Sequence, residues 1–463
     1  FYIKQVLVMS IMDFSGKNFL VIGAGISGRA ASVVLAGHGG TVTLNDMKAI
    51  DTAEQPWPDI EAAGVKLVFG SQETNLLDGM DVVVPSPVIS PEIPIMKEAI
   101  RRGLPIWSEV EVACRVTDAD VIGITGTNGK TTTTTLVGEI MKATGRQTVV
   151  GGNIGYGLSA QADNLPEEAV VVAELSSFQL EFTHSIKAKA ATILNITPDH
   201  LDRHHTMEGY AAAKERIFLN QDKGDYAVLN YDDERVRAMA GDMTGTVVYF
   251  STCGEVPEGA FYQDGQLILR LQGRDTVVCA ETDLHLFGKH NIQNCLAAIL
   301  LTYAAGAPLD VIRQVLKDFK GVEHRLEKVR TLHGVTYYND SKGTNVDASM
   351  KALEAFPQGH LILIAGGYDK MTPLDDFMAL AAKRVDTLIL IGDAAERFEA
   401  AAKKAGIQDI RRTGYSMEGA IMLARKIAKA PQAVLLSPAC SSFDMYDNFE
   451  QRGRVFKGIV NAI

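Results

Sequence analysis

The sequence has few cysteines and no long apolar run, and each absence narrows the possible classes of protein. Its five cysteines are scattered, odd in number and form no C-x-x-C pair: Cys114, Cys253, Cys279, Cys295 and Cys440. This usage indicates reduced thiols and argues against a disulfide framework or a cysteine zinc site. No stretch approaches the roughly 20 apolar residues of a membrane span. We therefore expect a cytoplasmic protein without membrane insertion.

Basic residues are in the minority. Lys and Arg total 45 against 56 Asp and Glu, which gives a net charge of −11. This acidic excess argues against a nucleic-acid binder, although local basic sites for phosphates remain compatible with it. The N-terminus lacks a charged targeting segment and a cleavage site, and the chain begins with Phe1 rather than Met. We expect the native fold to start near Met12.

The pattern of the 463 residues predicts an α/β protein of three domains. Three blocks alternate short apolar runs with helical patterns, which is typical of parallel sheets. We place the domains at residues 1–108, 109–321 and 322–463. The first block is expected to be Rossmann-like, and the second resembles a P-loop ATPase-type mononucleotide-binding domain. Residues 246–286 are predicted to form short β pieces with turns.

A G-x-G-x-x-G motif at 23–28 follows the first predicted strand, 18–22. Its glycines permit a tight turn and a close approach of a diphosphate to a helix N-terminus. Asp46 ends the next strand, where a carboxylate can bind a ribose hydroxyl. The motif alone fits a dehydrogenase cofactor, another diphosphate nucleotide or a purely structural turn.

A phosphate-cradling loop is predicted at 125–131, between a strand and a helix. Its backbone N–H groups would surround phosphates, Lys130 would reach the terminal ones and Thr131 could bind Mg²⁺. Ile124 stands where the strict pattern has its first glycine. The alternative is a glycine-rich turn with a surface lysine, but the order of elements favours ATP over a redox cofactor at this loop.

Other polar residues follow strands of the second block. Glu174 ends an apolar run, so it is placed either to hold Mg²⁺ or simply to be solvated. The cluster 195–205 contains three histidines. We favour a role for His200 near magnesium-bound phosphate over a zinc site at this cluster.

Three further candidates lie on predicted helices. For Lys214, the simplest interpretation is a solvated lysine. Asn291 and Asn294 share one helix face and suit either adenine recognition or capping.

The third block has polar loops after several strands, at 340–345, 366–370 and 437–444. Lysines, hydroxyl groups and glycines at several strand ends indicate an anionic ligand in this domain. Cys440 could act as a nucleophile, but no paired base is evident, which favours a small packed residue.

Taken in order, the motifs resemble those of the Mur ligase family of cell-wall enzymes. They are TGTNGKT at 125–131, ELSSFQL at 174–180, DHLDRH at 199–204, HNIQN at 290–294, HR at 324–325, NDSKGTN at 339–345 and SPACSSFD…NFEQRG at 437–453. The resemblance covers the chain from about Met12. Within the family, the sequence is most similar to members that add D-glutamate, because Asn128 stands where L-alanine-adding members typically have histidine.

The resemblance implies a Rossmann-like C-terminal domain and a set of ligands for each domain. UDP-N-acetylmuramoyl-L-alanine would be bound by Ile26, Ser27, Asp46, Met47, Lys48, Ser86, Asn153 and Ser176. ATP would be bound by Gly126, Thr127, Asn128, Gly129, Lys130, Thr131, Thr132, Asn291, Asn294, Arg325 and Asp340. D-Glutamate would be bound by Thr344, Lys370, Ser442, Phe443 and Phe449.

The resemblance also implies the catalytic apparatus. Two Mg²⁺ ions would be held by Thr131, Glu174, His200 and a carbamylated Lys214. The catalytic residues would be Lys130, Glu174, His200, Lys214 and Lys342. The implied reaction forms an acyl phosphate that the amine of D-glutamate then attacks, in peptidoglycan precursor synthesis. We expect a monomer with no nucleic-acid partner; a dehydrogenase and a non-catalytic nucleotide-binding scaffold are the alternatives.

Overall fold

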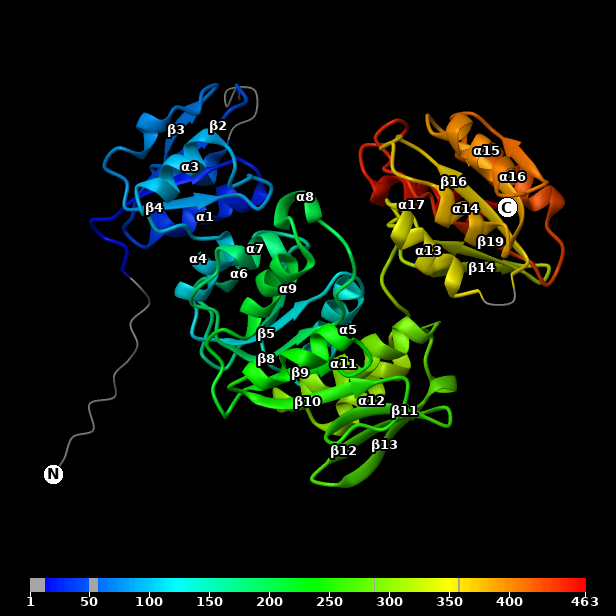
Figure 1. The fold of residues 1–463 in the computed structure, drawn as a ribbon, viewed down its shortest axis with the longest axis horizontal. Coiled ribbons are helices and arrows are strands. Elements are labelled where there is room, and N and C mark those ends of the chain that lie inside the picture. The colour runs from blue at the N-terminus through cyan, green and yellow to red at the C-terminus, as the bar shows by residue number, and fades with distance from the viewer. Residues whose placement is uncertain (1–12, 50–56, 287, 357–358) are drawn as a thin grey trace. The chain divides into compact units, whose positions relative to one another are not determined.

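The computed structural model describes residues 13–49, 57–286, 288–356 and 359–463, so the expected start near Met12 lies outside the described residues. Contacts divide the chain into two compact units. The first contains described residues up to Asp283 and Ile292–Asp318, and the second contains Leu284–Asn291 and Phe319–Ile463. Three sheets of mixed α/β architecture are present, two in the first unit and one in the second (Figure 1). The predicted α/β class is confirmed.

The first sheet is parallel and has the strand order β3-β2-β1-β4. Its strands are β1 (Asn18–Ile22), β2 (Thr41–Asp46), β3 (Lys66–Phe69) and β4 (Val82–Pro85). The helices of this part are α1 (Ile26–Gly37), α2 (Pro58–Ala62), α3 (Pro94–Arg101) and α4 (Glu109–Arg115). Side chains alternate across the sheet: Phe19 and Val21 enter one apolar cluster, while Leu20 and Ile22 enter another. Both faces are therefore buried, as the unbroken apolar run predicted.

The second sheet has the order β13-β12-β11-β10-β9-β8-β5-β7-β6. Its strands are β5 (Asp120–Thr125), β6 (Thr148–Gly152), β7 (Val170–Glu174), β8 (Ala188–Ile193), β9 (Tyr226–Asn230), β10 (Thr246–Ser251), β11 (Gly259–Gln263), β12 (Gln266–Leu271) and β13 (Arg274–Ala280). Its helices are α5 (Lys130–Ala143), α6 (Leu158–Ala162), α7 (Ser177–Glu181), α8 (Leu201–His204), α9 (Met207–Glu215), α10 (Glu234–Ala238), α11 (Lys289–Ala304) and α12 (Leu309–Asp318). β11, β12 and β13 pair antiparallel, so the predicted short β pieces extend this sheet.

Parallel pairing brings the carboxyl ends of β5, β7 and β8 to one edge. Ile124 on β5 is level with Glu174 on β7 and with Thr192 on β8. The polar segments that follow these strands therefore leave the sheet side by side. This register positions the phosphate loop beside Glu174.

The third sheet has the order β14-β15-β19-β16-β17-β18. Its strands are β14 (Glu327–Leu332), β15 (Val335–Asn339), β16 (Leu361–Gly366), β17 (Val385–Ile391), β18 (Ile410–Arg412) and β19 (Ala433–Leu436). Its helices are α13 (Val346–Glu354), α14 (Asp375–Ala381), α15 (Ala395–Lys404), α16 (Met417–Ile427) and α17 (Phe449–Ala462). All pairs are parallel except the β14–β15 hairpin, and separate apolar clusters cover the two faces. The Rossmann-like third domain expected from the motifs has this layered form.

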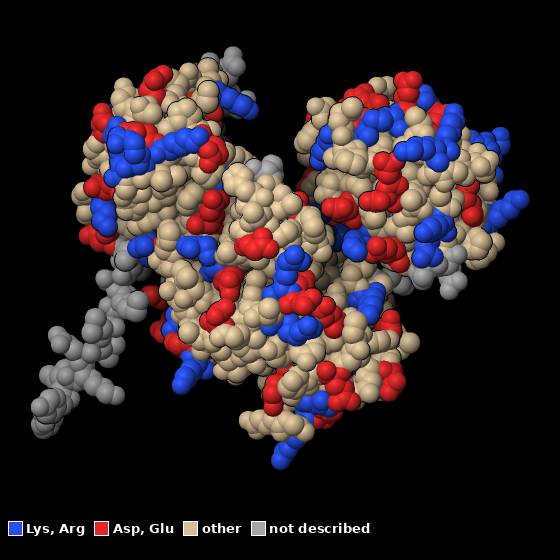
Figure 2. All heavy atoms as spheres, in the orientation of Figure 1, with Lys and Arg blue, Asp and Glu red and all other residues tan. Residues whose placement is uncertain are grey.

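Charges of both signs are mixed on the face of the molecule that Figure 2 shows. On the face shown in Figure 2, Lys and Arg are interspersed with Asp and Glu, and the coloured residues form no single basic patch there. Among the described residues, no helix is both long and apolar enough to cross a bilayer.

Candidate active site

The loop between β5 and α5 has the conformation of a phosphate cradle. Gly126 and Gly129 have φ of 149° and 87°, values that favour glycine, and helix α5 begins at Lys130. Lys130 Nζ donates hydrogen bonds to the carbonyl oxygens of Gly126 and Thr127, both at 2.8 Å. The ammonium group thus lies over its own loop, where it can meet phosphate oxygens at the N-terminus of α5.

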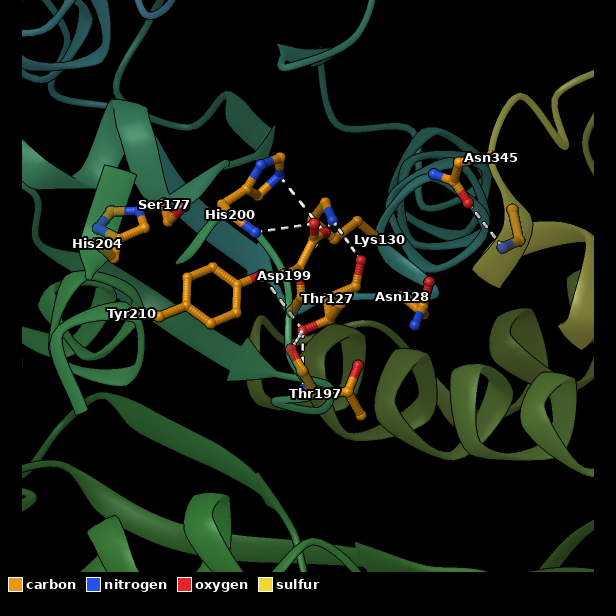
Figure 3. Close-up of polar contacts among 12 residues, drawn as sticks. Thr127, Asn128, Lys130, Ser177, Thr197, Asp199, His200, His204, Tyr210 and Asn345 are labelled. Carbon is orange, nitrogen blue, oxygen red and sulfur yellow. Dashed lines mark hydrogen bonds and ion pairs between the residues drawn. The ribbon is translucent and has the colours of Figure 1, made fainter. Parts of the chain in front are cut away.

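Residues after β8 fix this loop in place. The Asn195 side chain accepts a hydrogen bond from the Asn128 N–H at 2.8 Å and donates to the Asn128 carbonyl at 3.1 Å. Thr127 Oγ1 lies 3.2 Å from the Thr197 carbonyl and 3.3 Å from the Tyr210 hydroxyl (Figure 3). The loop is therefore held from two sides before any ligand binds.

Glu174 presents a carboxylate oxygen without a donor beside the loop. Its side chain is 2% exposed, and Oε1 accepts a hydrogen bond from Asn153 Nδ2 at 3.0 Å, while Oε2 has no hydrogen-bond partner among the described residues. A buried carboxylate oxygen without a donor is costly unless a cation or ligand satisfies it. Carboxylate and hydroxyl oxygens are ligands that Mg²⁺ prefers, so Glu174 and Thr131 fit that ion.

Lys214 is buried, which differs from the plain interpretation of a solvated helix lysine. It lies on α9, is 1% exposed, and its Nζ donates to the Gly126 carbonyl at 2.9 Å. Burial, and next the positive charge of Lys130, hold the pKa of Lys214 well below its usual range. The low pKa favours the uncharged amine over the ammonium, and the side chain touches the phosphate loop itself.

The histidines of the 199–204 motif have different surroundings. His200 adopts a left-handed conformation with φ of 52°, and its ring packs on Phe178 at a centroid distance of 4.8 Å. His204 Nε2 lies 2.9 Å from Ser177 Oγ, and burial lowers the pKa of His204. Figure 3 shows Asp199 beside His200, whose Nε2 lies 3.5 Å from the Asp199 carboxylate.

The glycine loop of the first sheet is built around Asp46 and Ser86. Asp46 accepts hydrogen bonds from the N–H groups of Ala24 and Lys48, both at 2.9 Å, and Ser86 Oγ donates to the Gly23 carbonyl at 3.0 Å. Ile26 and Met47 are 56% and 69% exposed. Exposed apolar side chains beside an open glycine loop are suited to contact a bound base or sugar.

In the second unit, Asp340 is enclosed at the end of β15. Its Oδ2 accepts a hydrogen bond from Ser437 Oγ at 2.7 Å and its Oδ1 accepts one from the Leu326 N–H at 3.2 Å. Burial raises the pKa of Asp340 to about 7, although the hydrogen bond from Ser437 and the positive charge of Arg325 act to lower it. Lys342 lies on the same loop, with its Nζ 5.6 Å from the ring centroid of Phe449.

Several residues expected to receive D-glutamate surround the ends of β15, β16 and β19. Lys370 Nζ donates to the Thr344 carbonyl at 3.1 Å, and the Tyr368 N–H donates to the Ser441 carbonyl at 3.0 Å. Ser442 is buried while Phe443 is 69% exposed. These loops follow strands of one sheet, and their binding of an anionic ligand stays a prediction.

The predicted asparagine pair lies on α11, where Asn291 and Asn294 are both buried. Ser176, another predicted ligand, caps α7 in a reciprocal arrangement with Gln179. Cys440 is buried and burial raises the pKa of its thiol to about 12, which fits a packed residue better than a nucleophile.

Comparison with known families decides between the alternatives. Residues 124–302 match the Mur ligase middle domain, and residues 324–440 match the Mur ligase glutamate ligase domain. The chain is 46% identical over 453 residues to the UDP-N-acetylmuramoylalanine--D-glutamate ligase of Desulfitobacterium hafniense (strain Y51), covering 97% of this chain and 98% of that protein. The chain belongs to the Mur ligase family.

Other relatives agree with this assignment. The enzyme of the same name from Pelotomaculum thermopropionicum is 43% identical, with 98% of this Mur ligase and 99% of that protein covered. Among solved structures, a pseudomurein peptide ligase type C from Methanothermus fervidus matches with a TM-score of 0.59 at 20% identity, covering 96% of this chain and 99% of that one. UDP-N-acetylmuramate-alanine ligase from Thermotoga maritima matches with a TM-score of 0.58 at 18% identity, with coverages of 96% and 99%. These structures support the three-domain α/β fold.

Sequence reasoning missed two residues that organise this Mur ligase site. Asn195 locks the phosphate loop, and Arg203 donates to the carbonyls of Pro87 and Ile89, just after Ser86. Both positions fall inside the polar cluster after β8, which was the available signal. In the described part of the chain, the one group of three potential metal ligands is Glu323, His324 and Glu327. Lys457 donates to both of those glutamates, at 3.0 and 2.5 Å, so one positive charge of the protein already offsets part of their negative charge.

Proposed function

We propose that this chain is an ATP-dependent ligase that adds D-glutamate to UDP-N-acetylmuramoyl-L-alanine through an acyl phosphate, in peptidoglycan precursor synthesis. The observation that carries the proposal is the 46% identity, over nearly both full lengths, to a relative named for this reaction. The phosphate loop with Lys130 and the carboxylate of Glu174 supply the charge that such chemistry needs. A dehydrogenase would need only the glycine loop at 23–28, and it would not need this separate phosphate loop.

The proposed role of the first unit is to reduce the repulsion between negatively charged reactants. A substrate carboxylate that attacks the γ-phosphate of ATP meets anionic repulsion, which the protein must reduce. The Lys130 ammonium and the N–H groups at the start of α5 supply fixed positive charge at the loop. Mg²⁺ held by Thr131, Glu174 and His200 would supply further neutralisation and alignment. Asn153 orients the Glu174 carboxylate through its 3.0 Å hydrogen bond.

The burial of Lys214 supports its carbamylation. An uncharged amine can attack CO₂: the new N–C bond uses the nitrogen lone pair, and one proton leaves to solvent, which gives a carbamate anion. The lowered pKa of Lys214 increases the fraction of the required uncharged amine. The resulting carbamate oxygens would add an anionic metal ligand beside the Gly126 carbonyl that Lys214 Nζ contacts at 2.9 Å.

The second unit would bind the rest of the reactants. The loops that carry Arg325, Asp340 and Lys342 are proposed to contact ATP, and those that carry Thr344, Lys370, Ser442, Phe443 and Phe449 are proposed to contact D-glutamate. The Lys370 ammonium, next to the Thr344 carbonyl, suits a carboxylate of an acidic amino acid. The domain boundaries, a cytoplasmic location and a monomeric state stay predictions.

Phosphate release from ATP tests the reaction directly. Purified protein is mixed with Mg²⁺, ATP and UDP-N-acetylmuramoyl-L-alanine, and D-glutamate, L-alanine or diaminopimelate is supplied as acceptor. We expect release only with D-glutamate, together with the matching mass increase of the nucleotide product. Release with another acceptor would retain the family and overturn the acceptor assignment. No release with any acceptor would favour the non-catalytic scaffold.

A further inference from the structure

The loop that carries Lys370 is anchored on both sides of that residue by one arginine. Arg397 on α15 binds the Asp369 carboxylate through two parallel contacts, Nε to Oδ2 at 2.8 Å and one terminal nitrogen to Oδ1 at 2.6 Å. Its other terminal nitrogen donates to the Thr372 carbonyl at 2.8 Å. Arg397 thus contacts the residue before Lys370 and the second residue after it.

The rest of the loop depends on this anchor. Asp369 Oδ1 also accepts a hydrogen bond from the Met371 N–H at 2.8 Å, and Met371 has φ of 57°, a left-handed conformation that is unfavourable for a non-glycine residue. The side chains of Arg397 and Asp369 are 29% and 18% exposed. The ion pair is therefore partly shielded from water, and it holds a strained turn next to an exposed lysine.

We propose that Arg397 and Asp369 are positioning residues that set the place of Lys370 and thereby the affinity for the acceptor amino acid. Neither residue is assigned contact with a substrate. This inference rests on the proposed function, because that function gives Lys370 its role toward the D-glutamate carboxylate. Without the ion pair, the turn relaxes and the Lys370 ammonium no longer stays beside the Thr344 carbonyl, 3.1 Å away in the structure.

Steady-state kinetics of Arg397→Ala test the proposal. We expect the KM for D-glutamate to rise at least tenfold, while the KM values for ATP and the UDP-substrate stay within twofold. Asp369→Asn should raise this KM less than Arg397→Ala does, because it leaves the contact between Arg397 and the Thr372 carbonyl in place. The double variant should give the same rise as Arg397→Ala, because the two residues act through one shared contact. Arg397→Lys should restore only part of the affinity, since an ammonium cannot reproduce the two-pronged contact.

The matched control is Lys404→Ala on the same helix. Lys404 pairs with Asp375 at 2.8 Å, and both side chains are 76% exposed, so this ion pair contributes little. We expect unchanged kinetics for that variant. An equal rise of all three KM values in Arg397→Ala, or no rise for D-glutamate, would overturn the proposal. If Arg397→Ala does not fold, Asp369→Asn carries the same test.

A second readout does not depend on the reaction. Trypsin cleavage after Lys370, followed by mass spectrometry of the folded protein, reports how firmly the loop is held. We expect cleavage to be at least fivefold faster in Arg397→Ala than in Lys404→Ala or the wild type. Equal cleavage rates would overturn the anchoring. Failure of the wild type to use D-glutamate would refute the proposed function instead, so the two failures are distinguishable.

Discussion

At the scale of single residues, Lys214 shows how burial lowers the pKa of an ordinary lysine side chain. Its helix contains alanines and polar residues that predicted a solvated lysine, and only the resemblance to known enzymes singled it out. The burial arises from contact with the phosphate loop 88 residues away in sequence, at Gly126. The residues next to Lys214 in sequence do not indicate this contact. The burial of Lys214 therefore could not be predicted from the local residue pattern alone.

Replacing Lys214 should separate activity from stability. We expect Lys214→Met to lose at least 1,000-fold in turnover, because a methionine can neither form a carbamate nor supply an anionic metal ligand. The free energy of unfolding should stay within about 1 kcal/mol of the wild type or exceed it, since a buried polar group is replaced by an apolar one of similar length. Phosphate release and urea unfolding give the two quantities.

The control is Lys187→Met, which changes a lysine whose side chain is 56% exposed and paired with Asp222. It should retain full activity. Depletion of CO₂ should slow the wild type, and added bicarbonate should restore it. Substantial turnover by Lys214→Met would contradict the role of this lysine.

Asp340 gives a pH-dependent contribution to stability. Its pKa is about 7 in the folded protein against an ordinary value of 3.8, with burial as the main cause. The folded state therefore keeps this proton while the unfolded state loses it, so stability falls as pH rises from about 4 to 7. Asp340→Asn, which cannot ionise, should gain stability relative to the wild type between pH 5 and pH 8. The gain is at most a few kcal/mol, at about 1.4 kcal/mol per pKa unit.

Urea unfolding of both proteins at the two pH values measures this difference. The asparagine keeps an acceptor for the Leu326 N–H and a polar group toward Ser437, so the comparison isolates the charge. A difference in unfolding free energy that is the same at pH 5 and pH 8 would show that Asp340 does not titrate in this range.

At the scale of helices and strands, a strand could be predicted where its sequence contains a clear run of apolar residues. The buried strand β1 was predicted with the bounds that the structure has, 18–22. The strands β14 and β18 were missed because they lie at sheet edges and read EKVRTL and IRR, without an apolar run. Strand β6, which ends in two glycines, was missed for the same reason. Polar positions at strand ends were nevertheless informative, since Glu174 lies beside the phosphate loop as its place in the pattern indicated.

The junction of β6 and β7 makes an element-scale prediction. Gly152 ends β6 with φ of 105°, and a Cβ there would overlap the carbonyl oxygen of Glu174. Gly152→Ala should therefore displace the end of β7 and the Glu174 carboxylate with it. We expect at least a tenfold rise in the KM for ATP and Mg²⁺, and a destabilisation larger than the roughly 1 kcal/mol of an ordinary left-handed glycine.

Gly145→Ala provides the comparison, because Gly145 follows α5 with φ of 85° and has open space where a Cβ would lie. That variant should lose about 1 kcal/mol of stability and keep its kinetics. Thermal unfolding and initial rates measure both effects. Similar behaviour of the two alanine variants would mean that the backbone contact with Glu174 has no bearing on the site.

At the scale of the whole molecule, three sheets form two compact units. Three blocks were predicted from the sequence, but which sheets share a unit was not predictable. The first two sheets share one unit because α1 and α4 both pack against α6. Pairs distant in sequence join these helices: His38, which follows α1, lies 2.7 Å from Asp163, which follows α6, and Ser159 of α6 donates to Glu109 of α4 at 2.6 Å. Burial raises the pKa of Glu109, and the hydrogen bonds from Ser159 oppose this shift. Such contacts join segments that are distant in sequence, and the residue pattern of one segment does not predict which other segment it will contact.

The second unit has the features of a domain that folds independently. Both of its apolar clusters draw only on residues from Leu326 onward, and its six strands pair only with one another. Because a complete sheet with two covered faces needs no further partner, we expect a fragment of residues 319–463 to fold alone. It should show a single cooperative thermal transition by far-ultraviolet circular dichroism and dispersed amide resonances by nuclear magnetic resonance. The Asp369–Arg397 pair lies wholly inside this fragment, so trypsin should cleave after Lys370 no faster there than in the full chain. A broad, non-cooperative transition would show instead that the second unit depends on the first for its stability.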